Sequence, residues 1–282
     1  MDFPGRGLKR KLERLLMPEL PEVETIRRQL ADSVVGAVVV GVEVRRASCY
    51  IGRELLSQEK IEKVARIGKY LFLHFESGRG FVIHLKMTGR MVIDVASYDK
   101  LPHTRVVIKL KDGRRLYYWD SRTFGYVKYV EDIELEHERQ KRKLGPDPWE
   151  MSEARFFTLT SQHMRPIKNL ILDQALLAGV GNIYANDGLW EAGIDPRRMA
   201  KNLTKKESDM LLASLRLVME RGLITGGASD NSYVNALGEK GSYQDEFRAY
   251  KRTGKPCLRC RKKLERIVVG GRGTWVCGKC QG

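Results

Sequence analysis

The sequence lacks several features that would define other classes of protein. No apolar run approaches the roughly 18 residues of a membrane-spanning helix, so a role inside a membrane is excluded. The five histidines show no metal-site spacing, and neither an internal repeat nor a low-complexity segment is present. Acidic residues are the minority, 35 against 51 basic ones. With 42% hydrophobic residues and a mean hydropathy of −0.39, the 282 residues are typical of a globular chain of about two domains.

The excess of positive charge is concentrated near the C-terminal end. Residues 247–282 contain eleven basic side chains and one acidic side chain, and so contribute +10 of the formal net charge of +16. Such a concentration favours a polyanionic partner, most often nucleic acid. On charge alone, a solvated basic surface remains the alternative.

Cysteine is almost absent outside that same segment, where four of the five cysteines form two pairs. Cys257 and Cys260 are separated by two residues, as are Cys277 and Cys280, and sixteen residues lie between the pairs. This spacing predicts a zinc ribbon, with one structural Zn²⁺ held by four thiolates. A disulfide framework would leave Cys49 unpaired and needs an oxidising compartment, and no signal-peptide pattern accompanies it.

Residues 18–145 are predicted to form a β-domain that begins with one helix. Leu20, Val23, Ile26 and Leu30 recur at helical spacing and indicate a helix over 21–32. Short β-branched and alternating runs separated by turn residues follow, which favours a β-sandwich or barrel. These runs cover residues 34–44, 69–76, 80–87, 105–113 and 126–130.

Residues 146–246 change to helical periodicity, and 247–282 form the ribbon domain. Thr204 and Glu207 have the spacing of a capping box at the start of the last predicted helix. A glycine-rich loop occupies about 226–246. The predicted fold class is therefore α+β, with three domains. The helices are expected over 152–162, 167–178, 182–192 and 204–221.

The first residues of the chain are interpreted as an appendage. Residues 1–17 are expected to be a non-native or mis-started extension, with Met17 as the true start. Removal of Met17 would leave Pro18 with a free secondary amine, and an α-amino group titrates near 7.7–8.0, so part of it is a nucleophile at neutral pH. Condensed with a sugar carbon, this amine would form a cationic iminium that favours elimination, and Glu19 beside it could donate a proton. The alternative is that Pro18 and Glu19 simply lead into the helix.

Six separated motifs resemble the formamidopyrimidine-DNA glycosylases, bacterial base-excision-repair enzymes for oxidised purines. The resemblance covers essentially residues 18–282, and the motifs occur in the order found in that family. They are PELPEVET at 18–25, GKYL at 68–71, HLKMTGRM at 84–91, DSRTFG at 120–125, IKNLILDQALLAGVGNIYAN at 167–186, and the ribbon with GRGTWVC at 271–277.

The resemblance implies four catalytic residues. Pro18 matches the nucleophile that attacks the anomeric carbon, and Glu19 matches the general acid. Lys69 matches a lysine essential in the lyase steps. Arg272 matches the arginine that holds the phosphate beside the lesion and is assigned to the second elimination. The resemblance also implies a helix-two-turns-helix element in the second domain.

Six further positions are expected to contact DNA. Extruding a base costs a few kcal/mol of stacking and pairing, so other groups must fill the gap. Met87, Arg122 and Phe124 match the family's void-filling residues, although Met87 and Phe124 would otherwise be assigned to the core. Lys168 and Asn182 match phosphate contacts. His103 matches a DNA-contact position, and a solvated turn is its alternative.

Some residues depart from the family pattern. Lys86 and Thr88 replace the more usual Gly and Ser around Met87, and Asp187 and Gly188 replace the usual Glu-Ala. The loop at 226–246 lacks the arginine commonly found where the extruded base is read. The catalytic pattern is intact, but the base preference is less certain.

The sequence thus predicts a bifunctional DNA glycosylase and apurinic/apyrimidinic (AP) lyase. Its expected partner is double-stranded DNA containing oxidised purines such as 8-oxoguanine and formamidopyrimidines, cut by β,δ-elimination. We expect a monomer in the bacterial cytoplasm or nucleoid, with no membrane partner. The alternatives are an endonuclease VIII-like enzyme for oxidised pyrimidines, against which Leu20 and Val23 argue, and a non-catalytic zinc-ribbon protein that binds DNA or RNA.

Overall fold

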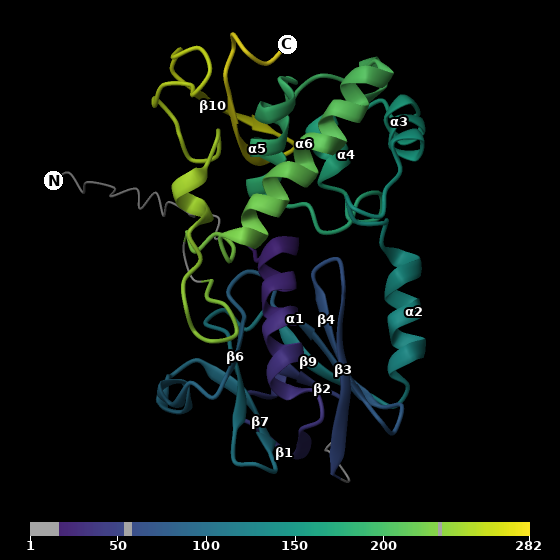
Figure 1. The fold of residues 1–282 in the computed structure, drawn as a ribbon, viewed down its shortest axis with the longest axis vertical. Coiled ribbons are helices and arrows are strands. Elements are labelled where there is room, and N and C mark those ends of the chain that lie inside the picture. The colour runs from purple at the N-terminus through teal and green to yellow at the C-terminus, as the bar shows by residue number, and fades with distance from the viewer. Residues whose placement is uncertain (1–16, 54–57, 231–232) are drawn as a thin grey trace, which may run out of the picture.

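The structure is a computed structural model that describes residues 17–53, 58–230 and 233–282. Residues 1–16, most of the predicted extension, lie outside the described residues. Figure 1 shows a strand-rich part that contains α1 and, stacked on it, a helical part that carries the C-terminal hairpin. Among the described residues, no helix combines the length and apolar composition needed to cross a bilayer.

The strand-rich part is a sheet folded into two layers. Its nine described strands have the order β2-β9-β5-β4-β3-β1-β7-β8-β6, and all neighbours are antiparallel except β2 and β9. Strand β1 pairs with β3 through only its first two residues and then with β7, which divides the sheet. Leu71 and Phe81 from one layer and Val106 and Tyr118 from the other pack in one buried cluster. The expected sandwich with one N-terminal helix is confirmed. The strands are β1 (Val38–Val44), β2 (Tyr50–Ile51), β3 (Glu59–Ile67), β4 (Tyr70–Phe75), β5 (Gly80–His84), β6 (Arg90–Ile93), β7 (Thr104–Leu110), β8 (Arg115–Trp119) and β9 (Tyr126–Val130).

Helix α1 (Leu20–Val34) joins the two parts. Pro21 suits its first turn, where a backbone N–H has no helical partner. Its apolar residues recur every three or four positions, so they line one face. Leu20 packs in the core of the helical part, whereas Val23, Ile26 and Leu30 pack in the core of the sheet.

The helical part and the C-terminal ribbon share one core. Leu189 of α5 and Leu215 of α6 belong to the same buried cluster as Cys257, Leu264 and Trp275 of the ribbon. The ribbon is therefore fixed against the helices by apolar packing. The elements are α3 (Glu153–Ser161), α4 (Ile167–Ile171), α5 (Asn182–Ala192), α6 (Lys205–Ile224), β10 (Glu265–Val269) and β11 (Arg272–Val276). Helix α2 (Ile133–Lys143) packs on the sheet instead, where Ile133 lies in a buried cluster with Phe72 and Val82.

One predicted helix is shorter than expected, and one helix was not predicted. The helix expected over 167–178 ends at Ile171 because the Gln174 side chain bonds the backbone of Leu172, Gly179 and Val180 and stabilises turns instead. Helix α2 was missed because its sequence is almost entirely charged and shows little apolar periodicity. Its start is stabilised by the Asp132 side chain, which accepts from the backbone N–H of Leu135.

Candidate active site and nucleic-acid interface

Glu19 lies where the two parts of the molecule meet. It immediately precedes α1, and its carboxylate accepts hydrogen bonds from the backbone N–H groups of Ile183 (2.8 Å) and Tyr184 (3.3 Å) at the start of α5. The first N–H groups of a helix have no helical partners, and the positive end of the helix dipole favours an anion. Glu19 is only 2% exposed, and the adjacent Pro18 is buried.

Burial changes the acidity of Glu19. Loss of water around the carboxylate raises its pKa to about 7, with a smaller contribution from the nearby Glu22 carboxylate. The positive charge of Lys69 and the two backbone hydrogen bonds oppose this rise. Glu19 therefore exchanges a proton near neutral pH, which a general acid requires.

Lys69 is a buried cation beside Glu19. It immediately precedes β4, is 6% exposed, and its Nζ donates to the backbone oxygen of Val180 at 3.1 Å. Burial lowers the pKa of Lys69. The charge of the Arg272 guanidinium lowers this pKa further, and the Glu19 carboxylate opposes part of the shift. The structure thus brings Glu19, Lys69 and Arg272 into electrostatic contact although they are far apart in sequence.

Arg272 is exposed at the first position of β11, and the helical part holds the turn that carries it. The backbone oxygen of Gly273 accepts from Asn182 Nδ2 (3.2 Å) and Lys168 Nζ (3.0 Å). Thr274 Oγ1 in turn donates to the backbone oxygen of Arg272. The position of Arg272 therefore depends on side chains of α4 and α5.

Lys168 is expected to contact a DNA phosphate, but the structure shows its side chain inside the protein. Lys168 is fully buried, and its Nζ donates to Asn186 Oδ1, Gly273 O and Thr274 Oγ1. These three acceptors use all the donors of an ammonium group. Burial and the charge of Arg272 lower its pKa to about 7. Lys168 supports the ribbon turn through its bonds to Gly273 and Thr274.

The expected void-filling residues lie on two turns of the sheet. Met87 is half-buried between β5 and β6, and Phe124 is 53% exposed between β8 and β9. The guanidinium carbon of Arg122 lies 4.6 Å from the centroid of the Phe124 ring. The exposure of Phe124 excludes a core position. His103 is half-buried, with Nδ1 3.0 Å from Arg105 Nη2 and its ring edge against Trp119.

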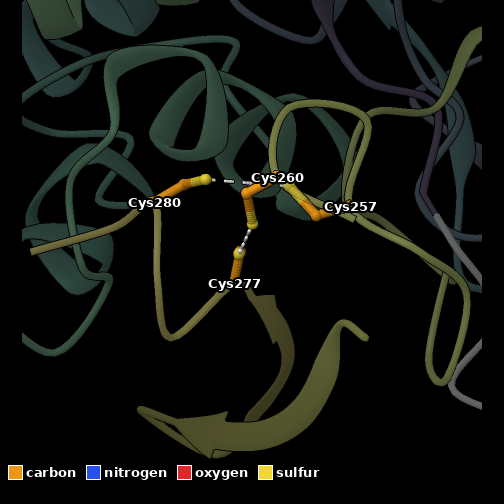
Figure 2. Close-up of side chains that lie close together, drawn as sticks. All are labelled: Cys257, Cys260, Cys277 and Cys280. Carbon is orange, nitrogen blue, oxygen red and sulfur yellow. Dashed lines mark hydrogen bonds between the residues drawn. The ribbon is translucent and has the colours of Figure 1, made fainter. Parts of the chain in front are cut away.

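The four ribbon cysteines converge on one point (Figure 2). Their sulfur atoms all lie within 4.8 Å of one another. Zn–S bonds of about 2.3 Å in a tetrahedron place sulfurs about 3.8 Å apart, so this donor set fits such an ion. The indole Nε1 of Trp190 donates to Cys257 Sγ, and Gln281 Oε1 accepts from the backbone N–H of Cys277, which orients two of the ligands.

Comparison with known proteins agrees with this geometry. The family models of the formamidopyrimidine-DNA glycosylase N-terminal domain, its H2TH domain and the zinc finger found in FPG and IleRS match residues 17–127, 144–233 and 254–282. The formamidopyrimidine-DNA glycosylase of Desulfitobacterium hafniense is 38% identical over 273 residues, which cover 94% of this chain and 100% of that protein. The chain belongs to the formamidopyrimidine-DNA glycosylase family.

Solved structures of this family have the same fold. The MutM (Fpg) protein of Thermus thermophilus has a TM-score of 0.84 and 39% identity, covering 94% of this chain and 98% of that one. A complex of Lactococcus lactis Fpg with DNA containing an abasic site has a TM-score of 0.85 and 31% identity, covering 93% and 99%.

Sequence reasoning missed Glu22, whose carboxylate connects three segments of the site. This carboxylate is 1% exposed and accepts from the backbone N–H groups of Glu19 (2.9 Å) and Ala228 (2.8 Å) and from Tyr184 Oη (2.8 Å). It thereby connects α1 with α5 and with the loop that follows α6. The available signal was its position three residues after Glu19, which is capping-box spacing.

The departures at Asp187 and Gly188 have a structural explanation. Asp187 is fully buried and accepts from the backbone N–H groups of Ala249 and Tyr250 and from Tyr243 Oη, so it holds the chain entering the ribbon. A Cβ atom at Gly188 would lie 2.7 Å from Leu215 Cδ2. A glycine lets α5 and α6 approach closely.

We expect Gly181→Ala to displace Glu19 and abolish base release. A Cβ atom at Gly181 would lie 2.2 Å from the Glu19 carboxyl carbon, closer than any non-bonded contact allows. The measurement is single-turnover base release, with circular dichroism to confirm folding. Gly41→Ala is the control, because nothing lies within 4 Å of a Cβ there. Full activity of Gly181→Ala would contradict this placement of Glu19.

We expect Cys277→Ser to release the metal and weaken DNA cleavage while the sheet stays folded. Loss of one of four ligands opens the site, and the hairpin that carries Arg272 then loses one of the contacts that hold it. Metal content by mass spectrometry and cleavage of lesion duplex are the measurements, with Cys49→Ala, outside the cluster, as control. Retained metal together with full activity would refute a structural metal.

Proposed function

We propose that the chain is a bifunctional DNA glycosylase and AP lyase that excises oxidised purines, such as 8-oxoguanine and formamidopyrimidines, from double-stranded DNA. The observation that carries the proposal is the buried Glu19 carboxyl beside Pro18, with a pKa of about 7 and a buried lysine next to it. Solved relatives are described in complex with Fapy-dG DNA, abasic-site DNA and carbocyclic 8-oxo-G DNA. We further propose that it acts as a monomer in the bacterial cytoplasm.

The Pro18 nitrogen acts as the nucleophile in this mechanism. An amide nitrogen has no available lone pair, so the reaction requires Pro18 to be the first residue of the active enzyme, without residues 1–17. The amine attacks the anomeric carbon of the extruded nucleotide, and Glu19 supplies the proton that the ring oxygen or the leaving base needs. The resulting iminium carries a positive charge that acidifies the neighbouring C–H bond of the sugar.

Lys69 and Arg272 serve the elimination steps. Lys69 has a lowered pKa and lies beside Glu19, so it can bind a phosphate or transfer a proton during the first elimination. Arg272 is exposed, with its turn supported by Lys168 and Asn182, so its guanidinium can bind the phosphate beside the lesion and assist the second elimination.

The interface with DNA is completed by the sheet turns and the ribbon. Met87 and Phe124 fill the space left by the extruded base, Arg122 bonds the estranged cytosine, and His103 contacts the backbone. Asn182, half-buried at the start of α5, contacts a phosphate. The metal of the four-cysteine site is one Zn²⁺ with a structural role, which stabilises the hairpin and takes no part in catalysis.

We expect borohydride to trap a covalent adduct on Pro18 with a duplex that contains 8-oxoguanine opposite cytosine. Reduction converts the iminium to a stable amine, and mass spectrometry of the digested adduct locates it. The protein that starts at Met17, with methionine removed, should form the adduct, and the protein that starts at Met1 should not.

A thymine glycol duplex tests the endonuclease VIII-like alternative. A strong preference of the enzyme for that lesion would favour this alternative. No adduct despite lesion binding would favour a non-catalytic DNA-binding protein.

We expect base release to decline relative to cleavage of a preformed AP site as pH rises from 6 to 8. The protonated fraction of Glu19 falls through this range because its pKa is about 7, and only base release needs its proton for the leaving base. The ionisation of Pro18 affects both rates equally, so its effect cancels in their ratio. A ratio that does not change with pH would contradict the role of Glu19 as proton donor to the base.

A further inference from the structure

Two turns of the sheet are joined through one buried carboxylate, Asp120. The first turn follows β5 and contains Met87, and the second follows β8 and contains Arg122 and Phe124. Asp120 stands between β8 and the second turn and is 0% exposed. Its Oδ1 accepts from Thr88 Oγ1 in the first turn, a contact that links segments 32 residues apart.

The same carboxylate also shapes the second turn. Asp120 Oδ1 accepts from the backbone N–H of Arg122 at 3.0 Å, and Oδ2 accepts from that of Gly125 at 2.9 Å. The backbone N–H of Asp120 donates to His103 O at 2.9 Å, and its backbone oxygen accepts from Arg105 Nε at 2.7 Å. Asp120 therefore contacts both turns and the strand that begins after His103.

The packing around Asp120 leaves the turns little freedom to move separately. Tyr118 Oη lies 3.4 Å from Asp120 Oδ2. A Cβ atom at Gly89 would lie 2.9 Å from that hydroxyl oxygen, and one at Gly125 would lie 2.1 Å from it. The backbone of both turns therefore packs directly against the Tyr118 hydroxyl. If one turn moved, the other would have to move with it.

Each turn also contains a strained residue. Lys86 has a φ of +50° and Thr123 a φ of +56°, which side-chain-bearing residues seldom adopt. Such conformations persist only where the surroundings enforce them. Here the backbone N–H of Lys86 donates to His84 Nδ1, and the hydrogen bonds of Asp120 enclose Thr123.

We propose that Asp120 is a positioning residue that makes the two turns a single rigid wedge, so that Met87, Arg122 and Phe124 enter an opened duplex together. The inference rests on the proposed function. It follows that Asp120 and Thr88 act on the opening of the duplex and leave the chemistry at the sugar unchanged. Pre-organisation of the three side chains removes the entropy that ordering them on DNA would cost.

The test compares Thr88→Val with Thr88→Ser. Valine keeps the shape of threonine but removes the hydroxyl that reaches Asp120, whereas serine retains it. The substrates are an 8-oxoguanine duplex and the same lesion inside a bubble of mismatched pairs, where no stacked partner has to be held. The wild-type protein and Asp112→Asn, an exposed position in the β7–β8 turn, are the controls.

We expect Thr88→Val to lower kcat/KM on the duplex by about tenfold and to leave the bubble substrate nearly unchanged. The hydroxyl's hydrogen bond to Asp120 and the longer one that it accepts from the Arg122 N–H are both lost. Thr88→Ser should match the wild type on both. Asp120→Asn should show the same selectivity with a larger loss, and the Thr88 pair decides the matter if that variant does not fold. Equal losses on duplex and bubble, or no loss on either, would overturn the inference. All of these proteins start at Pro18, and an inactive wild-type protein of that form would instead refute the proposed function.

A second measurement follows the opening step directly. A 2-aminopurine placed beside the lesion becomes more fluorescent when it loses its stacking partner. We expect Thr88→Val to bind the lesion duplex but to give a slower and smaller rise in fluorescence than Thr88→Ser. Identical traces for the two variants would also overturn the inference, independently of any cleavage.

Discussion

The hydrogen bonds from the first turn of α5 to the Glu19 carboxylate are the interaction on which the rest of the site depends. A hydrogen bond to a charged group contributes about 1.5–3 kcal/mol, yet the pKa of Glu19 is still raised to about 7. The loss of hydration therefore exceeds what two N–H donors and the charge of Lys69 return. An acid held in this balance is fixed in position but remains able to release its proton.

The same contact explains how two separate cores produce one site. Helix α1 buries Leu20 in the helical core and most of its other apolar residues in the sheet core, so its start cannot shift without disturbing both. Glu22 extends this connection to the loop after α6 through the backbone N–H of Ala228. The start of α1, directly after Pro18, is consequently held by both parts of the molecule.

Much of the fold and part of the site could be predicted from the sequence, because local sequence patterns determine these features. The sandwich, helix α5 and the four-cysteine cluster follow from periodicity and spacing. Helix α2 could not be recognised because its interactions are mainly between charges. The burial of Lys168 could not be foreseen either, since it depends on Gly273 and Thr274, more than a hundred residues later in the chain. A lysine in a motif reveals its charge, but only the fold reveals whether that charge faces solvent.

The ribbon brings a third cation to a site that already contains two buried lysines. Burial, together with the smaller effect of the Arg272 charge, lowers the pKa of both Lys69 and Lys168, that of Lys168 to about 7. A phosphate bound to Arg272 would cancel part of this repulsion and raise both pKa values, so substrate binding and protonation of the lysines are linked. Anion binding and protonation of the two lysines therefore favour each other. A bound phosphate would leave both lysines positively charged when the chemistry begins. The position of the ribbon hairpin thus affects the charge state of the two buried lysines.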